Sequence, residues 1–126
     1  MRMFFQYKPG DDVGQLENWP FNNPTSNYVI IEGSPQAYGR IDVGGAGHTS
    51  RLGVWRCTKG TFECTEQGDE MMSILSGRCR VINHTTNVTY ELGPGDCLFV
   101  RDQSRVTWVI LDEVVKVFYG QKLSQF

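Results

Sequence analysis

Hydrophobic and polar residues alternate along most of the chain, in short runs that are separated by glycine-rich turns. The runs cover 28–31, 39–43, 52–57, 61–65, 70–75, 78–82, 88–92, 97–100, 106–111 and 114–119. A period of two residues, with turn residues at roughly ten-residue spacing, is typical of the strands of a β-sandwich or β-barrel. No segment longer than about two turns has the period of a helix. The pattern therefore predicts an all-β domain.

Residues 1–28 lack this alternation, and turn pairs such as Pro9–Gly10 interrupt them. The segment nevertheless holds several aromatic residues, among them Phe4, Tyr7, Trp19 and Phe21. Burying an aromatic side chain gives a large gain in free energy, so this many aromatic residues are unfavourable in a free tail. We expect an irregular N-terminal arm over 1–28, packed on its own barrel or on a partner subunit, and a single β-domain over 29–126.

Composition narrows the class of protein. A chain of 126 residues, 40% of them hydrophobic and 21% charged, has the size and make-up of one folded domain. Lysine and arginine number 12 and aspartate and glutamate 14, and this net charge of −2 argues against nucleic acid or an anionic membrane as partner. No stretch approaches the ~20 apolar residues that span a bilayer. Without a secretory signal pattern at the start, we expect a cytoplasmic protein whose four cysteines are reduced and mostly buried.

Two charged residues lie in otherwise apolar strands. Glu70 opens one strand, and the period of two places it on the same face as Met72 and Ile74. Lys116 shares a face with Phe118 in the last strand. Burying a charge is costly unless a counter-ion, a metal or a ligand compensates it. The two residues predict either an acid–base or ligand-holding pair, or an ion pair that is only structural.

Several ordered segments resemble one family of small cupins. GVWRCTKGTF at 53–62 resembles the family segment GxWxCxPGxF, and 69–77 resembles its DE…LxG strand. GDCLFV at 95–100 and the later segments around Trp108 and 115–118 follow in the family order. The match runs from 32 to 119. The family includes the cupins related to ureidoglycine aminohydrolase and the ethanolamine-utilisation cupin.

The resemblance implies a double-stranded β-helix, the jelly roll of the RmlC-like cupin barrel, with a ligand site inside the barrel near its mouth. Family members usually form dimers, so a homodimer is expected. Together with the alternation, the resemblance predicts a pocket of Glu70, Met72, Ile74, Trp108, Lys116 and Phe118, with Cys64 and Glu66 at its mouth. Arg101 and Arg105 replace family turn residues nearby, where they either bind a carboxylate or phosphate or remain surface arginines.

The metal ligands of the family are missing. A metal-binding cupin presents an HxH pair, then a glutamate and a later histidine. If Glu70 is the family glutamate, the HxH pair falls at Cys64 and Glu66, or at Glu63 and Thr65 if one residue is inserted. Neither alignment supplies an imidazole, so we expect no metal cofactor. If a divalent metal binds at all, its ligands are expected to be Cys64, Glu66 and Glu70.

These observations favour a cupin with a degenerate metal site that binds a small polar metabolite. One alternative is an enzyme that acts on a small amino or ureido compound by C–N bond hydrolysis, lyase or isomerase chemistry, with Glu70 and Lys116 as acid and base. Another is a non-catalytic interaction module that uses the aromatic arm. The residues leave open whether the protein is an enzyme.

Overall fold

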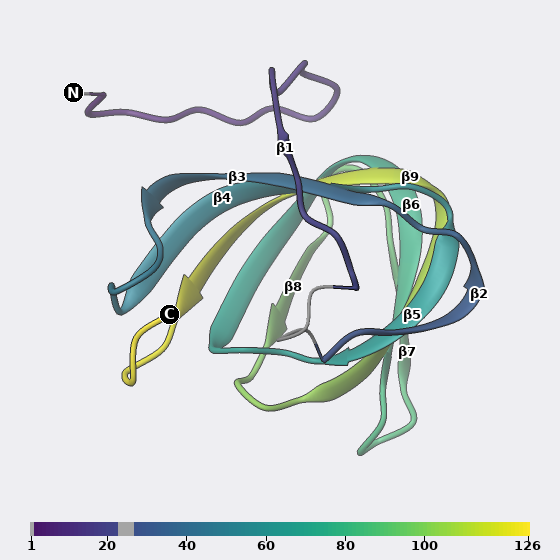
Figure 1. Cartoon of the computed structure of the whole chain (residues 1–126). Helices are drawn as coiled ribbons and strands as arrows, with labels where there is room; N and C mark the ends of the chain where they lie inside the picture. Colours follow the sequence, from purple (N-terminus) through teal and green to yellow (C-terminus); the bar gives the residue numbers. More distant parts are fainter. Residues whose placement is uncertain (1, 23–26) are drawn as a thin grey trace.

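The computed structural model describes residues 2–22 and 27–126, and this part of the chain is built from β-strands and loops (Figure 1). None of these residues belongs to a helix that is long and apolar enough to cross a membrane. The strands are β1 (Glu17–Asn18), β2 (Val29–Gly33), β3 (Ala37–Gly44), β4 (Ser50–Cys57), β5 (Gly60–Thr65), β6 (Asp69–Asn83), β7 (Thr89–Leu92), β8 (Cys97–Val100) and β9 (Arg105–Gln121).

The strands form one strongly curled antiparallel sheet around a common interior, as Figure 1 shows. Its main order is β1-β3-β4-β9-β5-β2, and β6 pairs with β7, β8 and β9. The long strand β9 pairs with β6 along one edge, and with β5 and then β4 along the other. Curling leaves few sheet edges unpaired. The prediction of an all-β jelly roll is confirmed.

Strand β6 is longer than the sequence pattern indicated. The pattern predicted two strands, 70–75 and 78–82, with a turn at Gly77. The structure has one strand with register shifts around that glycine. Gly77 has a φ of +80°, and a Cβ there would lie 2.0 Å from the backbone oxygen of Glu113 on β9. The glycine therefore serves a β-bulge and a close approach of two strands, rather than a chain reversal.

The barrel interior is filled mainly by hydrophobic side chains from β4, β5, β6 and β9. Phe62 and Trp108 stack at an interplanar angle of 8°, and the centroid of the Trp55 ring lies 5.5 Å from that of Trp108. Burying each such side chain contributes about 1.5–3 kcal/mol. Smaller members of this core are Cys57, Met72, Ile74, Cys79, Val81, Val106, Ile110 and Val114.

The four cysteines are free thiols, and three of them, Cys57, Cys64 and Cys79, are buried. Burial raises the pKa of Cys57 to about 12 and that of Cys79 to about 11. These thiols therefore stay protonated and act as small hydrophobic core residues. The expectation of unpaired, mostly buried cysteines is confirmed.

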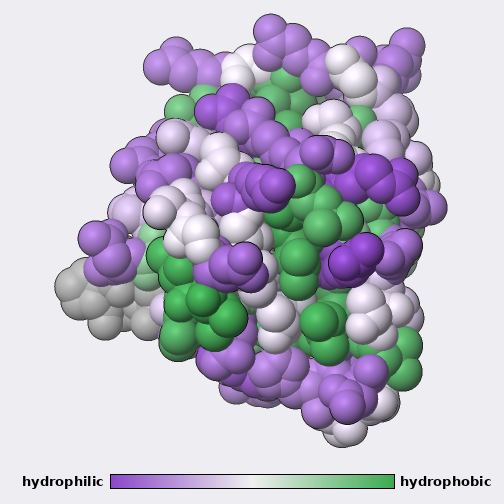
Figure 2. Space-filling model, turned by 90° about the vertical axis from the view of Figure 1, so that its right-hand side faces the viewer, coloured by the Kyte–Doolittle hydropathy of each residue, from purple (hydrophilic) through white to green (hydrophobic). Residues whose placement is uncertain are grey.

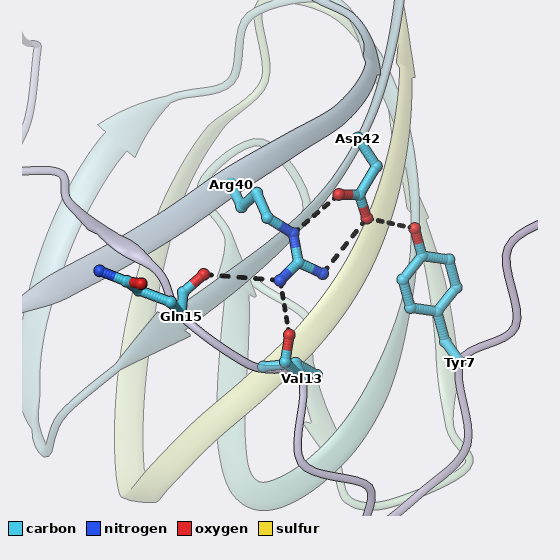
Figure 3. Close-up of polar contacts among 5 residues, drawn as sticks. All are labelled: Tyr7, Val13, Gln15, Arg40 and Asp42. Atoms are coloured by element: carbon cyan, nitrogen blue, oxygen red, sulfur yellow. Dashed lines mark hydrogen bonds and ion pairs between the residues drawn. The ribbon is translucent and has the colours of Figure 1, made fainter. Parts of the chain in front are cut away.

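A polar network attaches the first part of the arm to β3 (Figure 3). The Tyr7 hydroxyl donates to Asp42 Oδ2 at 2.5 Å, and Arg40 Nε donates to Asp42 Oδ1 at 2.7 Å. The Arg40 Nη1 atom donates to the backbone oxygens of Val13, at 2.5 Å, and Gln15, at 3.5 Å. Partial burial favours a raised Asp42 pKa, but the hydrogen bonds from Arg40 and Tyr7 outweigh it and lower the pKa. Asp42 is therefore a charged anchor for the arm.

The second part of the arm packs on the barrel of its own chain. Strand β1 pairs with β3, and the backbone N–H of Trp19 donates to the carbonyl of Ala37 at 2.9 Å. Phe21 is buried, with its ring centroid 4.6 Å from that of Phe62 in the core. The aromatic residues of this part of the arm thus join the core of the same chain.

Gly39→Ala tests this packing, because a Cβ at Gly39 would lie 2.1 Å from the Trp19 ring. We expect the ring to be displaced and the free energy of unfolding to fall by about 1–3 kcal/mol. Urea unfolding followed by circular dichroism measures this. Gly93→Ala is the control, since the atoms nearest to its Cβ would be those at the flexible end of the Arg78 side chain. Adding Trp19→Ala to Gly39→Ala should cost less than Trp19→Ala alone, and full additivity would contradict the packing.

Candidate functional site

A cavity of about 460 Å³ lies between the inner surface of the barrel and the arm. Its volume is in the range of small-molecule sites. The arm contributes Trp19 and Phe21 to its wall. The barrel residues that give the cavity its chemical character are Arg51 and Trp55 from β4, Glu66 after β5, Glu70 from β6, and Trp108, Lys116 and Phe118 from β9.

A buried ion pair forms part of the cavity wall. Lys116 Nζ donates to Glu70 Oε2 at 2.8 Å, and each residue is only 6% exposed. Both side chains point inward because their strands alternate: Glu70 shares the buried face of β6 with Met72, and Lys116 shares that of β9 with Phe118. The two charged residues that stood out in the sequence are thus in direct contact.

Aromatic rings surround the ammonium group of Lys116. Its Nζ lies 4.5 Å from the centroid of the Trp108 ring and 4.8 Å from that of Trp55, within the range of cation–π attraction. Burial alone would lower the pKa of Lys116, but the negative charges of Glu70 and Glu66 outweigh it. The net effect raises the pKa, so Lys116 remains a cation at physiological pH.

A second carboxylate, Glu66, lines the same cavity. Trp108 Nε1 donates to Glu66 Oε1 at 3.1 Å, and the Cys64 thiol donates to the same oxygen at 3.4 Å. Burial, followed by the charge of Glu70, raises the pKa of Glu66. The cavity therefore holds two carboxyl groups with different partners: an ammonium for Glu70, and an indole and a thiol for Glu66.

The cavity residues do not fit the metal centre that the fold family implies. Among residues 2–22 and 27–126, no group of three or more His, Cys, Asp or Glu side chains is placed to hold a metal ion. Burial raises the pKa of the Cys64 thiol, which is protonated and donates to Glu66 in this structure. The ammonium of Lys116 already binds Glu70 and compensates its negative charge, which is what a bound metal cation would do.

The structure brings most of the predicted pocket residues together. Glu70, Lys116, Trp108, Phe118 and Glu66 line the cavity. Three more predicted residues lie close to them without lining the cavity: Met72, whose Sδ is 4.0 Å from Lys116 Nζ, Cys64 beside Glu66, and Ile74, which is fully buried.

The two predicted arginines lie elsewhere. Arg101 is exposed in the loop after β8, beside a separate cavity of about 300 Å³. Arg105 begins β9, and its Nη2 binds Glu63 Oε1 at 3.0 Å on the outer side of β5. Neither arginine lines the cavity that contains Glu70.

Sequence reasoning missed Arg51, Trp55 and the arm residues of the cavity wall. Arg51 and Trp55 lie on the same face of β4. Their partners on β9 are Gly120 for Arg51 and Lys116 for Trp55. Their period of two was visible in the sequence and could have placed them on one face. The sequence contains no signal for the pairing register of β4, and it is this register that places the face of Arg51 and Trp55 on the cavity.

Comparisons with known proteins identify the family. Residues 44–118 match the family model described as the EutQ-like cupin domain, which covers more than half of the chain. The chain therefore belongs to this family of cupins, which confirms the resemblance seen in the sequence. No curated protein matches the sequence. Membership narrows the function to that of a cupin that binds a small molecule or acts on one.

Solved structures with low sequence identity have the same fold. A putative ethanolamine utilization protein EutQ from Salmonella typhimurium LT2 is 18% identical, with a TM-score of 0.59 over 68% of this chain and 69% of that chain. A cupin-like protein from Thermotoga maritima MSB8 is 11% identical, with a TM-score of 0.65 over 90% and 84% of the two chains. A structure reported among DMSP lyases is 17% identical, with a TM-score of 0.59 over 69% and 48%. These similarities establish the cupin jelly roll.

The Glu70–Lys116 pair should couple strongly in unfolding experiments. Glu70→Gln or Lys116→Met alone leaves a buried group without its counter-ion, and we expect a loss of about 3–5 kcal/mol in the free energy of unfolding. The double variant should recover much of this loss. Arg80→Gln is the control, because it breaks an ion pair with Glu91 whose side chains are 45% and 60% exposed. Additive single effects in urea unfolding would contradict the contact.

Glu66 should make stability depend on pH. Its pKa is raised in the folded state above the ordinary value of 4.5, so the stability it contributes is complete below that value and is lost as pH rises through the folded pKa. Glu66→Gln removes this titration while it keeps an oxygen that accepts from Trp108. We expect the free energy of unfolding, measured with urea from below pH 4.5 upward through the folded pKa, to change less with pH in the variant than in the wild type. Parallel profiles for variant and wild type would show that Glu66 has no raised pKa.

Proposed function

We propose that the protein binds a small polar metabolite in the 460 Å³ cavity, with Glu70 and Lys116 as its central polar contacts. The observation that carries the proposal is that this buried ion pair faces a cavity instead of being closed into the core. Aromatic walls and a few convergent polar groups are the usual composition of a small-molecule site.

The energetics of the ion pair support this proposal. Taking two charges out of water costs several kcal/mol per ion, and hydrophobic residues of similar volume often stabilise a protein as well or better. Glu70 and Lys116 are both 6% exposed, so they carry this cost. A ligand that hydrogen-bonds to the free oxygen of Glu70 and to the remaining protons of Lys116 offsets it.

The same geometry supports binding without a tightly held metal. The ammonium of Lys116 provides the positive charge that a divalent ion provides in a metal-binding cupin, and it does so in contact with Glu70. The family membership supports a cupin function.

Catalysis is the second candidate, and it is favoured by the position of a carboxylate and an ammonium 2.8 Å apart on the cavity wall, where both can reach one substrate. In this version the protein acts on a small amino or ureido compound, or as a lyase, which is the activity named for one structural neighbour. The raised pKa of Lys116 makes the ammonium a proton donor or an electrostatic contact rather than a base. The structure thus supports binding more directly than acid–base catalysis.

We also propose that the protein is a cytoplasmic homodimer. Strand β2 lies at the end of the strand order, and its Val29, Ile30 and Ile31 are 49%, 47% and 55% exposed. Figure 2 shows hydrophobic patches between polar residues on the side of the molecule where β2 lies. Four unpaired thiols support a reducing compartment. Sedimentation that shows a monomer at all concentrations would contradict the dimer.

The central proposal predicts that small polar metabolites bind where Trp55 and Trp108 report on them. We expect at least one member of a panel of small hydroxy, amino and ureido compounds to change the tryptophan fluorescence of the wild-type protein. The double variant Glu70→Gln/Lys116→Met, which removes both charges of the ion pair together, should lower the affinity about tenfold or more. Equal affinity for wild type and double variant would overturn the proposal.

Metal analysis provides the companion measurement. Protein purified without an affinity metal column should contain no near-stoichiometric metal, and Mn, Fe, Ni or Zn should not raise its melting temperature, because a bound ion stabilises the folded state by mass action. A near-stoichiometric metal, or a large shift by one of these ions that Glu70→Gln removes, would replace the metal-free proposal with a metal site.

A further inference from the structure

One cationic side chain of the cavity, Arg51, has no counter-ion in the described part of the chain. None of the four ion pairs found there involves it. Its Nε atom is buried and has no hydrogen-bond partner among the described residues. A buried unpaired donor costs about 1–3 kcal/mol, and more when it carries a charge. Such a group requires an explanation.

The position of Arg51 in the sheet places it in the same cavity as the Glu70–Lys116 pair. On β4 it shares a face with Gly53 and Trp55, which lie opposite Phe118 and Lys116 of β9. Directly opposite residues of an antiparallel pair project on the same side of the sheet. Arg51 therefore lines the cavity from the same inner surface that presents Lys116.

One glycine, Gly120, makes room for the aromatic ring that packs on Arg51. Gly120 of β9 lies opposite Arg51 on one side and opposite Glu70 of β6 on the other. A Cβ at Gly120 would lie 3.7 Å from Arg51 Cγ and 3.2 Å from the Phe126 ring. The absence of a side chain at Gly120 thus leaves room for the Phe126 ring beside Arg51. Arg51 and Glu70, on the two strands that flank Gly120, both line the cavity.

Two aromatic rings hold the Arg51 side chain. Its Cζ lies 4.1 Å from the centroid of the Phe126 ring and 5.7 Å from that of Phe118. The backbone of Phe126 is itself fixed, since its N–H donates to the carbonyl of His48 and its carbonyl accepts from Gly47 N–H, both at 2.9 Å. A guanidinium held between rings pays little further entropy when it binds an anion.

We propose that Arg51 binds the carboxylate of a small organic acid, whose second polar group reaches the Glu70–Lys116 pair. The inference rests on the proposed binding function and specifies its ligand class. Lys116 pairs with Glu70, and the other carboxyl group of the cavity, Glu66, accepts from an indole and a thiol. Arg51 forms an ion pair with neither carboxyl group, so its charge matches one negative charge on a ligand. A monocarboxylate supplies that charge, and guanidinium binds carboxylate through two parallel hydrogen bonds.

Arg56 provides a matched comparison within the same strand. Its Nε is also buried without a partner among the described residues, and its Cζ lies 4.6 Å above the Tyr38 ring. Arg56 is one residue out of phase with Arg51 and Trp55, so it projects on the other side of β4 and does not line the cavity. Removing the charge of Arg56 therefore alters the outer side of β4 and leaves the residues of the proposed site unchanged.

The test compares acids with their neutral amides: lactate with lactamide, and glycerate with glyceramide. Affinities are measured by tryptophan fluorescence and calorimetry on the full chain, with inorganic phosphate as a further probe. We expect at least one acid to bind wild type about tenfold or more tightly than its amide. Arg51→Gln should lower the acid to the affinity of its amide, Arg51→Lys should restore part of the difference, and Arg56→Gln should change neither.

The outcomes separate this inference from the proposed function. If amides bind as well as acids and still require Glu70 and Lys116, Arg51 is not an acid-binding residue while the cavity remains a binding site. If acids bind wild type and Arg51→Gln equally, or if only phosphate binds, the carboxylate assignment is overturned. If no compound binds, both proposals fail. The acid-to-amide ratio of the wild-type protein decides the matter even if Arg51→Gln does not fold.

Discussion

The buried ion pair between Glu70 and Lys116 is the constraint on which the rest of the site depends. It brings opposite charges to 2.8 Å inside a barrel whose other inward residues are mainly hydrophobic. The Trp55 and Trp108 rings stabilise the ammonium through cation–π attraction, and its charge in turn limits the chemistry of the cavity. The chain itself thus supplies the cation that compensates the charge of Glu70, and the polar ligand that we propose would contact both members of the pair.

The arm completes the cavity that this pair faces. The network of Tyr7, Arg40 and Asp42 fixes its first part on β3, and the packing of Trp19 and Phe21 brings its second part against the barrel interior. Part of the cavity wall is thus built by residues that precede the barrel. Packing in the core of the same chain explains Trp19 and Phe21, whereas Phe4 in the first part of the arm is 90% exposed.

Much of the fold followed from local patterns, whereas the site followed only in part. Alternation placed Glu70 and Lys116 on inward faces correctly, because each strand has a period of two. It failed at Gly77, where the same residue type that ends strands elsewhere permits a bulge within β6. Arg51 was not identified because its importance comes from strand register and from two distant rings, Phe118 and Phe126. Such contacts between remote segments leave no periodic signal in the sequence.

The central claim is that Lys116 is a buried cation that binds Glu70 and faces the ligand cavity. Nuclear magnetic resonance of labelled lysine side chains tests it most directly, because the chain has only four lysines to distinguish. The account predicts that the Lys116 signal titrates above the ordinary pKa of 10.5, loses this shift in Glu70→Gln, and moves when a ligand enters the cavity. A Lys116 that titrates below 10.5, or whose signal no bound ligand changes, would contradict the account.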